Sequence, residues 1–253
     1  MSALSNSSTS SDRLRAVTLV ILCALGSAAA QTGTGVQRTV DKATAQMSTN
    51  PPVQSNTPPP FPESRPTSTP YAGDLSIFEY PDRDKKLQVG RVMDLLGISE
   101  GKSVADLGAG SGWFTARAAR RVGVKGTVYA EDINPGAVSY IDARVKREGL
   151  TNVRAVLGSP DDPKLPAGSV DAVLLLKVYH EIAHPVQVMS TVKAGLRPGA
   201  RVGIIDRNGN GVDHGLDRAI VEKEMTAAGY RLTGEYDFTK ADGQDYFLIF
   251  KVR

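Results

Sequence analysis

The sequence predicts an α/β fold with a doubly wound, mostly parallel sheet. Three observations lead to this prediction. From residue 84 onward, short apolar runs alternate with stretches of helical periodicity. A glycine-rich turn follows the first apolar run. The last two runs are separated only by Lys-Ala-Asp-Gly-Gln, which is typical of the turn of an antiparallel hairpin. Helices between strands act as crossovers, so the strands they join lie parallel.

Residues 84–157 hold the opening helix and the first three strands. The helix is predicted within residues 84–98 and stops at Gly97. Strands are predicted at 103–107, 127–131 and 153–157, with a helix in each of the two gaps. The positions expected to face inward on these three helices are Leu87, Val92, Leu95 and Leu96, then Phe114, Ala118 and Val122, then Val138, Ile141 and Val145.

Residues 169–252 complete a seven-stranded sheet with a C-terminal antiparallel hairpin. The run at 169–176 is apolar on consecutive positions, as expected of a central strand covered on both faces. The remaining elements are a helix through Val188, Val192 and Leu196, a strand at 201–205, a helix at about 215–228 with Leu216, Ala219, Ile220 and Ala227 inward, and strands at 231–238 and 245–252. Ligands of such sheets bind beyond the carboxyl ends of the strands, where we expect the functional residues.

The N-terminus has the pattern of a secretory signal peptide. Arg13 and Arg15 precede an apolar stretch over 16–30 that ends in three alanines. As a helix this stretch would span about 22 Å at about 1.5 Å per residue, less than the roughly 30 Å of a hydrocarbon core. We therefore predict a cleaved leader over 1–30, an exported or periplasmic protein, and no stable membrane insertion after cleavage.

A linker follows the leader. Eight of the fifteen prolines lie within residues 51–70, among serine, threonine and asparagine. Residues 31–72 cannot bury enough apolar surface to offset their ordering entropy, so we predict a disordered or polyproline-like linker. The folded domain is then expected over 73–253.

Composition and charge exclude several functions. The net charge is +3, and the arginines and lysines alternate with apolar residues at helical spacing, which is typical of solvated helix faces and not of a nucleic-acid track. We expect no nucleic-acid partner. Cys23, in the leader, is the only cysteine, so the folded part has no disulfide, thiolate ligand or cysteine nucleophile. The oligomeric state stays open.

The glycine-rich turn begins directly after Asp106 and Leu107. Gly108, Gly110 and Gly112 occupy alternate positions, and each lets the backbone come close to a ligand. Their spacing differs from the dinucleotide fingerprint G-x-G-x-x-G, and an acid before the turn would repel a pyrophosphate. A cationic ligand fits this turn better.

The stretch VADLGAGSGWFT at 104–115 resembles the first motif of class I S-adenosylmethionine-dependent methyltransferases, an acid followed by G-x-G-x-G. The resemblance covers about residues 84–253. It implies a Rossmann-like methyltransferase fold, S-adenosylmethionine as cofactor and S-adenosylhomocysteine as product. The residues implied at the methionine end of the cofactor are Asp106, Gly108, Ala109, Gly110 and Gly112.

The same resemblance implies cofactor contacts after the next two strands. Asp132, with Glu131 as the alternative, occupies the position that binds the ribose hydroxyls, and strand register decides which of the two faces the ligand. A role in capping the following helix is the competing interpretation. The third strand is followed by the residues implied near the adenine, which are Asp161 or Asp162 with Gly158 and Ser159 as backbone contacts.

The fourth strand leads into VYHEIAHP, which contains the string H-E-x-x-H. On a helix, His180, Glu181 and His184 would match the zinc motif of metallopeptidases. Pro185 disfavours helical angles at His184, and nothing in the sequence positions the remaining histidine, His214, as a third ligand. We therefore predict no metal site, and a zinc hydrolase is kept as an alternative.

This segment also resembles the acceptor side of small-molecule methyltransferases, written V-x-H-H/E-x-x-x-P. A hydroxyl acceptor would require a base, for which His180, His214 and Tyr179 are candidates, with Glu181 as an orienting group. Lys177 stands where family members often carry an acid, which leaves open its implied contact with the cofactor.

The resemblance thus implies in-line transfer of a methyl group from S-adenosylmethionine to a small or medium organic acceptor. A cofactor-binding module without activity is the alternative. Because S-adenosylmethionine is made in the cytosol, two alternatives to export are also kept. One is a retained leader that tethers the domain to the membrane, and the other is a misassigned start and a cytoplasmic protein.

Overall fold

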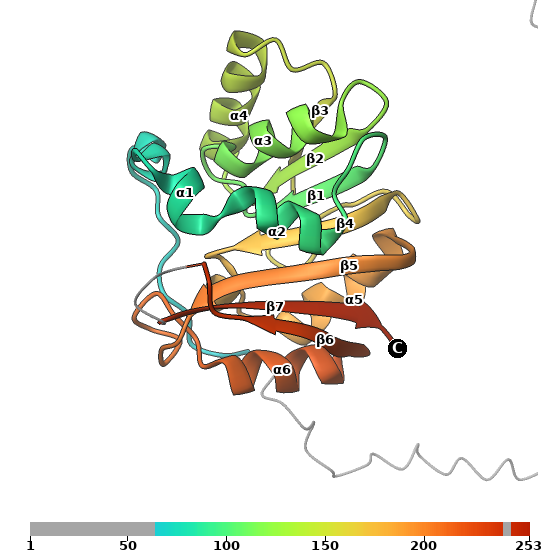
Figure 1. Ribbon diagram of the computed structural model, residues 1–253. Helices are drawn as coiled ribbons and strands as arrows, with labels where there is room; N and C mark the ends of the chain where they lie inside the picture. The colour runs from blue at the N-terminus through green and yellow to red at the C-terminus, as the bar shows by residue number, and fades with distance from the viewer. Residues whose placement is uncertain (1–63, 240–243) are drawn as a thin grey trace, which may run out of the picture. The chain divides into compact units, whose positions relative to one another are not determined.

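The computed structural model describes residues 64–239 and 244–253, so the predicted leader and most of the predicted linker lie outside the described residues. Seven strands form one sheet in the order β3-β2-β1-β4-β5-β7-β6. Strands β1 to β5 run parallel, and β7 pairs antiparallel with both β5 and β6 (Figure 1). This is the doubly wound, mostly parallel sheet that the sequence predicts.

The elements alternate along the chain as expected. The strands are β1 Ser103–Leu107, β2 Thr127–Asp132, β3 Val153–Leu157, β4 Val170–Leu176, β5 Leu196–Arg207, β6 Tyr230–Tyr236 and β7 Asp245–Val252. The α-helices are α1 Arg83–Leu87, α2 Val89–Leu96, α3 Trp113–Val122, α4 Pro135–Arg147, α5 Pro185–Gly195 and α6 Arg218–Ala227, and two short 3₁₀ helices are η1 Leu75–Glu79 and η2 Tyr179–Glu181.

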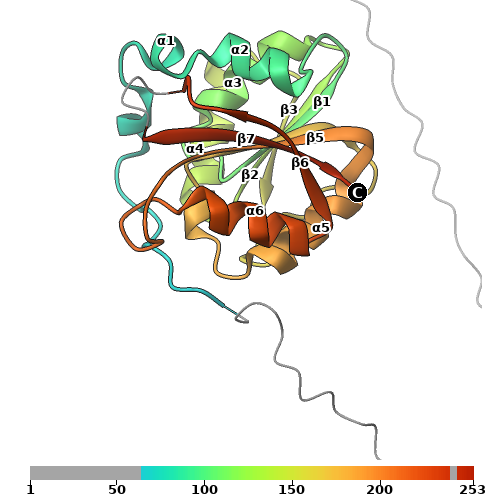
Figure 2. The same ribbon diagram turned by 60° about the horizontal axis from the view of Figure 1, so that its bottom comes forward.

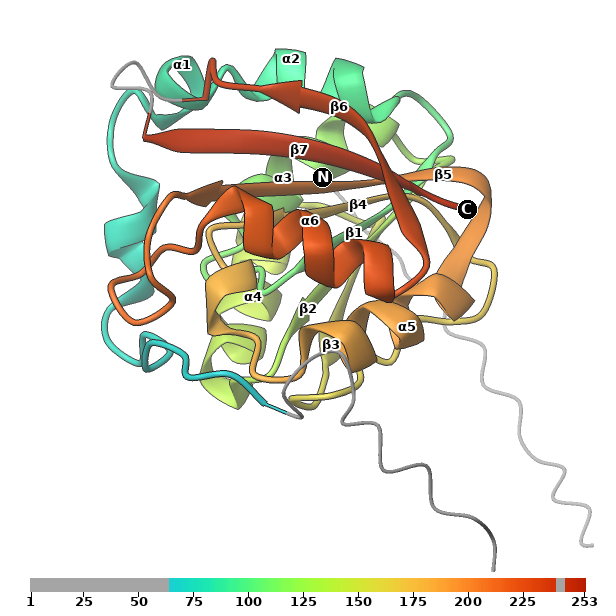
Figure 3. The ribbon, with the colours of Figure 1, turned by 90° about the horizontal axis from the view of Figure 1, so that it is seen from below.

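Helices cover both faces of the sheet. Side chains of α1, α2 and α3 pack with Val104, Ala172 and Leu174 on one face. Side chains of α5 and α6 pack with Ala105 and Val173 on the other face (Figures 2 and 3). Burial on both sides explains the uninterrupted apolar run of β4. None of the helices within residues 64–239 and 244–253 has the length and hydrophobicity that a membrane crossing requires.

The opening helix differs from the prediction of one helix over 84–98. It is divided into α1 and α2 by Gln88, whose φ is 50°. Leu87 and Val89, on either side of the break, are both buried in the same apolar cluster. Residues two positions apart point away from each other in a continuous helix, so the break allows both side chains to enter the core.

The inward face of α6 also differs from the prediction. Ala219, Ile220 and Ala227 are exposed, and Leu216 is buried but precedes the helix. The buried residues within the helix are Val221, Glu224 and Met225. Glu224 is polar, so hydrophobic periodicity does not identify the face of the helix that it occupies as the buried one. It can be buried because it pairs with Arg65, from a distant segment of the chain.

That distant segment lies within the predicted linker. The Arg65 guanidinium pairs with Glu224, with Nε and Oε1 3.2 Å apart, and both side chains are nearly buried. It also donates to the carbonyl oxygens of Tyr179 and His180, at 2.6 and 3.2 Å. Ser68 is buried as well. The packed domain therefore begins before residue 73, because specific polar contacts order a segment that has little apolar surface.

Candidate functional site

A cavity of about 380 Å³ lies at the carboxyl ends of β1, β2 and β4. This is the switch point of the sheet, where the chain leaves β1 toward β2 on one side and β4 pairs on the other. Nine of the residues singled out from the sequence line the cavity: Asp106, Gly108, Ala109, Gly110, Glu131, Asp132, Ser159, Lys177 and Glu181.

The glycine-rich turn forms one wall of the cavity. Gly108 and Gly110 have φ values of 65° and 55°, in the left-handed region that favours glycine. A Cβ on Gly108 would overlap the side chain of Val178. A Cβ on Gly110 would meet only Phe78 Cδ2, another residue of the cavity wall, at 3.9 Å. The backbone at Gly110 is therefore open to a ligand, whereas Gly112 lies behind the turn as the N-cap of α3.

Two buried carboxylates stand beside this turn. Asp106 Oδ2 accepts a hydrogen bond of 2.6 Å from the Thr115 hydroxyl, and burial raises the pKa of Asp106 to about 6. Burial, together with the charge of Asp132, raises the pKa of Glu131 to about 8. Removing a carboxylate from water disfavours its charged form unless a cation compensates. These groups therefore provide a place for positive charge.

Asp132 ties the turn to the end of β2. Its Oδ2 accepts from the Gly110 N–H and its Oδ1 from the Asn134 N–H, both at 2.9 Å. Each carboxylate oxygen has a second lone pair, so both can also accept from ligand hydroxyls. Asp132 is only half-buried and lines the cavity, and the neighbouring Ile133 adds apolar surface.

Acidic groups outnumber basic groups in the cavity wall. The acids are Asp106, Glu131, Asp132 and Glu181, and the bases are Arg83 and Lys177. The Lys177 ammonium lies 2.5 Å from Oδ1 of buried Asp245, so its charge is already compensated. Lys177 thus stands at the wall with its own acidic partner.

The loop after β3 reaches the cavity only in part. Ser159 lines the cavity, whereas Gly158 packs directly against the Glu131 carboxylate. Asp161 Oδ1 lies 2.6 Å from His184 Nδ1, and Asp162 Oδ1 accepts from the Lys164 N–H at 2.8 Å. Neither aspartate lines the cavity. The acidic residue that was expected near the adenine is therefore not part of the cavity wall.

Sequence reasoning missed the wall contributed by residues 71–83. Tyr71, Phe78, Tyr80 and Arg83 all line the cavity, and Tyr71 packs edge-on against Phe78 with ring centroids 5.4 Å apart. The Arg83 guanidinium lies over the Trp113 ring, 4.3 Å from its centroid. The signal was present in the sequence as three aromatic residues within ten positions, directly after the proline-rich stretch.

The H-E-x-x-H string does not form a zinc-peptidase site. His180 and Glu181 lie in the short 3₁₀ helix η2, the backbone is extended at Ile182, and His184 caps α5. His184 contacts Asp161. The two histidines therefore do not share a helix face, because Pro185 begins a new helix after His184. The zinc hydrolase alternative is not supported.

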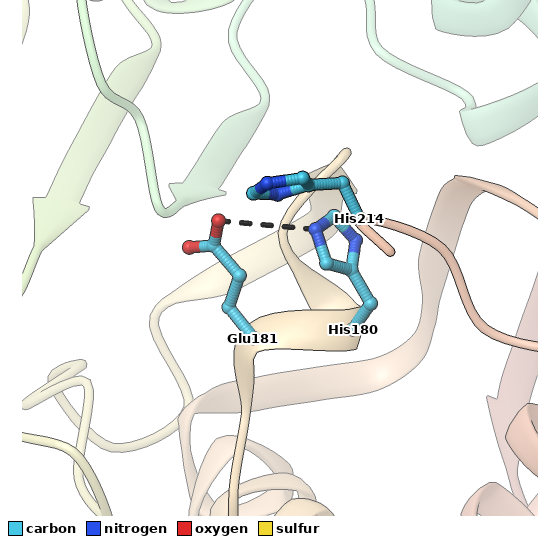
Figure 4. A group of neighbouring side chains, drawn as sticks. All are labelled: His180, Glu181 and His214. Atoms are coloured by element: carbon cyan, nitrogen blue, oxygen red, sulfur yellow. Dashed lines mark ion pairs between the residues drawn. The ribbon is translucent and has the colours of Figure 1, made fainter. Parts of the chain in front are cut away.

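His180 instead contacts residues from other elements. Its Nδ1 lies 2.9 Å from both carboxylate oxygens of Asp206, on β5. The ring of His214 stands perpendicular to that of His180, at a centroid distance of 5.9 Å (Figure 4). Glu181 extends from η2 toward the same point, with Oε1 3.8 Å from His180 Nε2. The predicted orienting group, Glu181, is thus not the residue that holds the imidazole.

The four candidate bases differ in their access to the cavity. Glu181 lines it, whereas His180, His214 and Tyr179 do not. Tyr179 is fully buried beside Glu224, and this burial raises the pKa of its hydroxyl well above the ordinary value. Tyr179 therefore packs in the core and does not reach the cavity.

Comparison with known proteins relates the sequence and the fold to methyltransferases. A family described as a methyltransferase domain matches residues 104–199, which contain β1 to β4 and the glycine-rich turn. This central part of the chain is thus similar to methyltransferase domains. A crystal structure of a SAM-dependent methyltransferase from Aquifex aeolicus has this fold, with a TM-score of 0.65, 24% identity, and coverage of 72% of this chain and 100% of that one.

The curated relatives of the chain differ in the acceptors that their names indicate. Nocamycin O-methyltransferase of Saccharothrix syringae is 34% identical over 114 residues, which are 45% of this chain and 41% of the relative. Protein-L-isoaspartate O-methyltransferase of Pyrococcus horikoshii is 30% identical over 98 residues, 39% of this chain and 44% of the relative. The matches thus span less than half of the length of these relatives.

Proposed function

We propose that this chain binds S-adenosylmethionine in the cavity and transfers its methyl group to a small or medium organic acceptor. The observation that carries the proposal is the excess of carboxylates around a glycine turn that is open to a ligand. Asp106 and Glu131 are buried with raised pKa values, and a cation would restore their charged forms. S-adenosylmethionine has a sulfonium and an ammonium group. The residues present therefore fit this cofactor.

The roles of the wall residues follow from their chemistry. Asp132 has free lone pairs on both oxygens and would accept from the ribose hydroxyls. Ile133 would lie against the adenine, since it is an exposed apolar side chain of the cavity wall. Arg83, stacked on Trp113, forms no ion pair with a carboxylate of the described residues and would bind the carboxylate of the methionine end.

The bound cofactor would supply a methyl group on a positively charged sulfur, which a nucleophilic atom of the acceptor displaces in line. This chain would contribute mainly by holding the two reactants, and such alignment can lower a barrier by up to about 7–11 kcal/mol. With a hydroxyl acceptor, Glu181 would take the proton, because it alone of the four candidate bases lines the cavity. The aromatic segment at 71–80 would exclude water from that side.

A pair of glycine variants tests the proposal. Gly110 and Gly101 have left-handed φ values of 55° and 78°, so alanine strains the backbone at both. Only at Gly110 does the added methyl enter the cavity wall, since nothing lies within 4 Å of a Cβ at Gly101. In calorimetric titrations of the full chain with S-adenosylhomocysteine, we expect Gly110→Ala to weaken binding at least tenfold and Gly101→Ala to leave it unchanged.

Failure of the unaltered chain to bind S-adenosylhomocysteine would overturn the proposed site, as would equal affinities of the two variants. Transfer is tested separately, with methyl-labelled cofactor and extracts of small organic compounds. Tight binding without transfer to any fraction would support the inactive binding module instead.

A further inference from the structure

A cluster of three potential metal ligands adjoins the cavity. It consists of His180, Glu181 and His214, whose ligand atoms all lie within 4.8 Å of one another (Figure 4). The first two residues belong to η2, and the third lies in the loop between β5 and α6. We propose that this cluster binds a divalent transition-metal ion.

The state of His180 is the main argument. Its side chain is 3% exposed, and its Nε2 is buried without a hydrogen-bond partner. A carboxylate can only accept, so in the neutral form of the ring the proton is on Nδ1, which donates to Asp206. Nε2 therefore presents a lone pair toward Glu181 and His214. A buried acceptor without a donor costs free energy, and a bound cation would remove this cost.

Asp206 supplies the outer support that metal-binding histidines require. It is fully buried, and its carboxylate also accepts from the backbone N–H groups of His180 and Arg207, at 3.1 and 2.9 Å. These bonds fix the carboxylate, which in turn fixes the ring orientation and tautomer of His180. Histidine ligands almost always donate their second ring N–H in this way, which keeps the coordinating nitrogen unprotonated.

The ligand atoms lie slightly farther apart than they would on a bound ion, but the difference is small. His180 Nε2 and Glu181 Oε1 are 3.8 Å apart, too far for a hydrogen bond. Ligand atoms on one tetrahedral ion lie roughly 3.4 Å apart, given bonds of about 2.0–2.1 Å. Glu181 is half-buried and His214 is exposed, so small side-chain rotations can close this difference.

The donor set indicates the class of metal. Two imidazoles and one carboxylate suit borderline ions such as Zn²⁺, Co²⁺ or Fe²⁺ better than Mg²⁺ or Ca²⁺, which prefer oxygen ligands. Three protein ligands leave at least one coordination position free. Since Glu181 also lines the cavity, the ion would lie at the cavity wall, and in the metal-bound chain Glu181 would be a ligand and not a base. Metal binding itself does not depend on the proposed methyl transfer.

The metal-free full chain is titrated with Co²⁺ while its visible absorption is recorded. We expect one equivalent to bind and to produce the bands of coordinated Co²⁺, and Zn²⁺ to displace it. His214→Ala should weaken binding by more than about 100-fold, beyond the 10–100-fold effect that we expect for the supporting change Asp206→Asn. His214 is exposed, so its replacement leaves the core intact.

His184→Ala is the matched control, because it removes the other histidine of the H-E-x-x-H string without touching the cluster. It should retain Co²⁺ binding. Absence of the Co²⁺ bands in the unaltered chain, or equal affinities of the unaltered chain and His214→Ala, would overturn the proposal. Loss of binding on His184→Ala would do the same. Titration with S-adenosylhomocysteine in parallel shows whether the cofactor site stands or fails independently.

Discussion

The Nδ1 atom of His180 lies 2.9 Å from both carboxylate oxygens of Asp206, and both side chains are buried. The two residues are 26 positions apart, on η2 and on β5. The H-E-x-x-H string suggests that His180 acts together with His184, four residues later. In the fold, His180 instead contacts Asp206, on the strand that follows it in the chain. This contact decides the tautomer of His180 and directs its second nitrogen toward Glu181.

The Asp132 carboxylate is expected to be the main anchor of the cofactor. Asp132→Asn replaces the charged carboxylate, whose oxygens would accept hydrogen bonds from the ribose hydroxyls, with a neutral amide. Hydrogen bonds to charged groups contribute about 1.5–3 kcal/mol, so affinity for S-adenosylhomocysteine should fall roughly 10- to 100-fold in calorimetry. Asp142→Asn, at an exposed position of α4, is the control and should bind normally. Unchanged affinity of Asp132→Asn would place the ribose elsewhere.

Burial of Glu131 makes stability depend on pH. Its pKa is raised from 4.5 to about 8, so between these values the native state holds a proton that the unfolded state has released. Stability from this group is therefore complete below about pH 4.5 and is lost as pH rises toward 8. At about 1.36 kcal/mol per pKa unit, the loss has an upper bound of roughly 5 kcal/mol.

Glu131→Gln stays neutral at every pH, so it should avoid this loss. In urea unfolding of the cofactor-free chain, we expect the variant to gain roughly 2–4 kcal/mol over the unaltered chain between pH 5 and pH 9. Glu222→Gln, on α6 and away from the cavity wall, should show no such trend. A pH-independent difference for Glu131→Gln would contradict the raised pKa.

The Arg65–Glu224 ion pair should be necessary for stability. Its side chains are 9% and 7% exposed, and breaking a buried pair by removing one partner costs about 3–5 kcal/mol. Arg65→Met should lower the free energy of unfolding by this amount, whereas Arg231→Met, at an exposed position of β6, should have little effect. The double variant Arg65→Met with Glu224→Leu should recover part of the loss. An Arg65→Met chain as stable as the unaltered one would show that the 64–72 segment is dispensable.

Gly108→Ala tests the contact between the glycine turn and Val178, which follows β4. Its φ of 65° and the φ of 78° at Gly101 give similar backbone strain, about 1–2 kcal/mol. Only at Gly108 does the new methyl overlap Val178, which adds about 1–3 kcal/mol of overpacking. Denaturant unfolding should therefore show a larger loss for Gly108→Ala. Equal losses would mean that Val178 moves aside at no cost.

The sequence by itself determined the sheet and the place of the site. Strand positions follow from local sequence patterns, and β1 and β3 have the predicted bounds, although β1 is buried at every position and β3 is a partly exposed edge strand. The turn from Gly108 to Gly112 was equally readable, since left-handed backbone selects glycine. The connection order then places the strand ends at one edge of the sheet.

Only the tertiary structure decided which side chains meet at that edge. The inner face of α6 was mispredicted because Glu224 is buried by Arg65, more than 150 positions away. The aromatic wall around Phe78, the pairing of His180 with Asp206 and the approach of His214 likewise join residues from separate elements. Local periodicity describes which face of an element is buried, whereas such contacts depend on how the elements pack, and no single segment of the sequence contains that information.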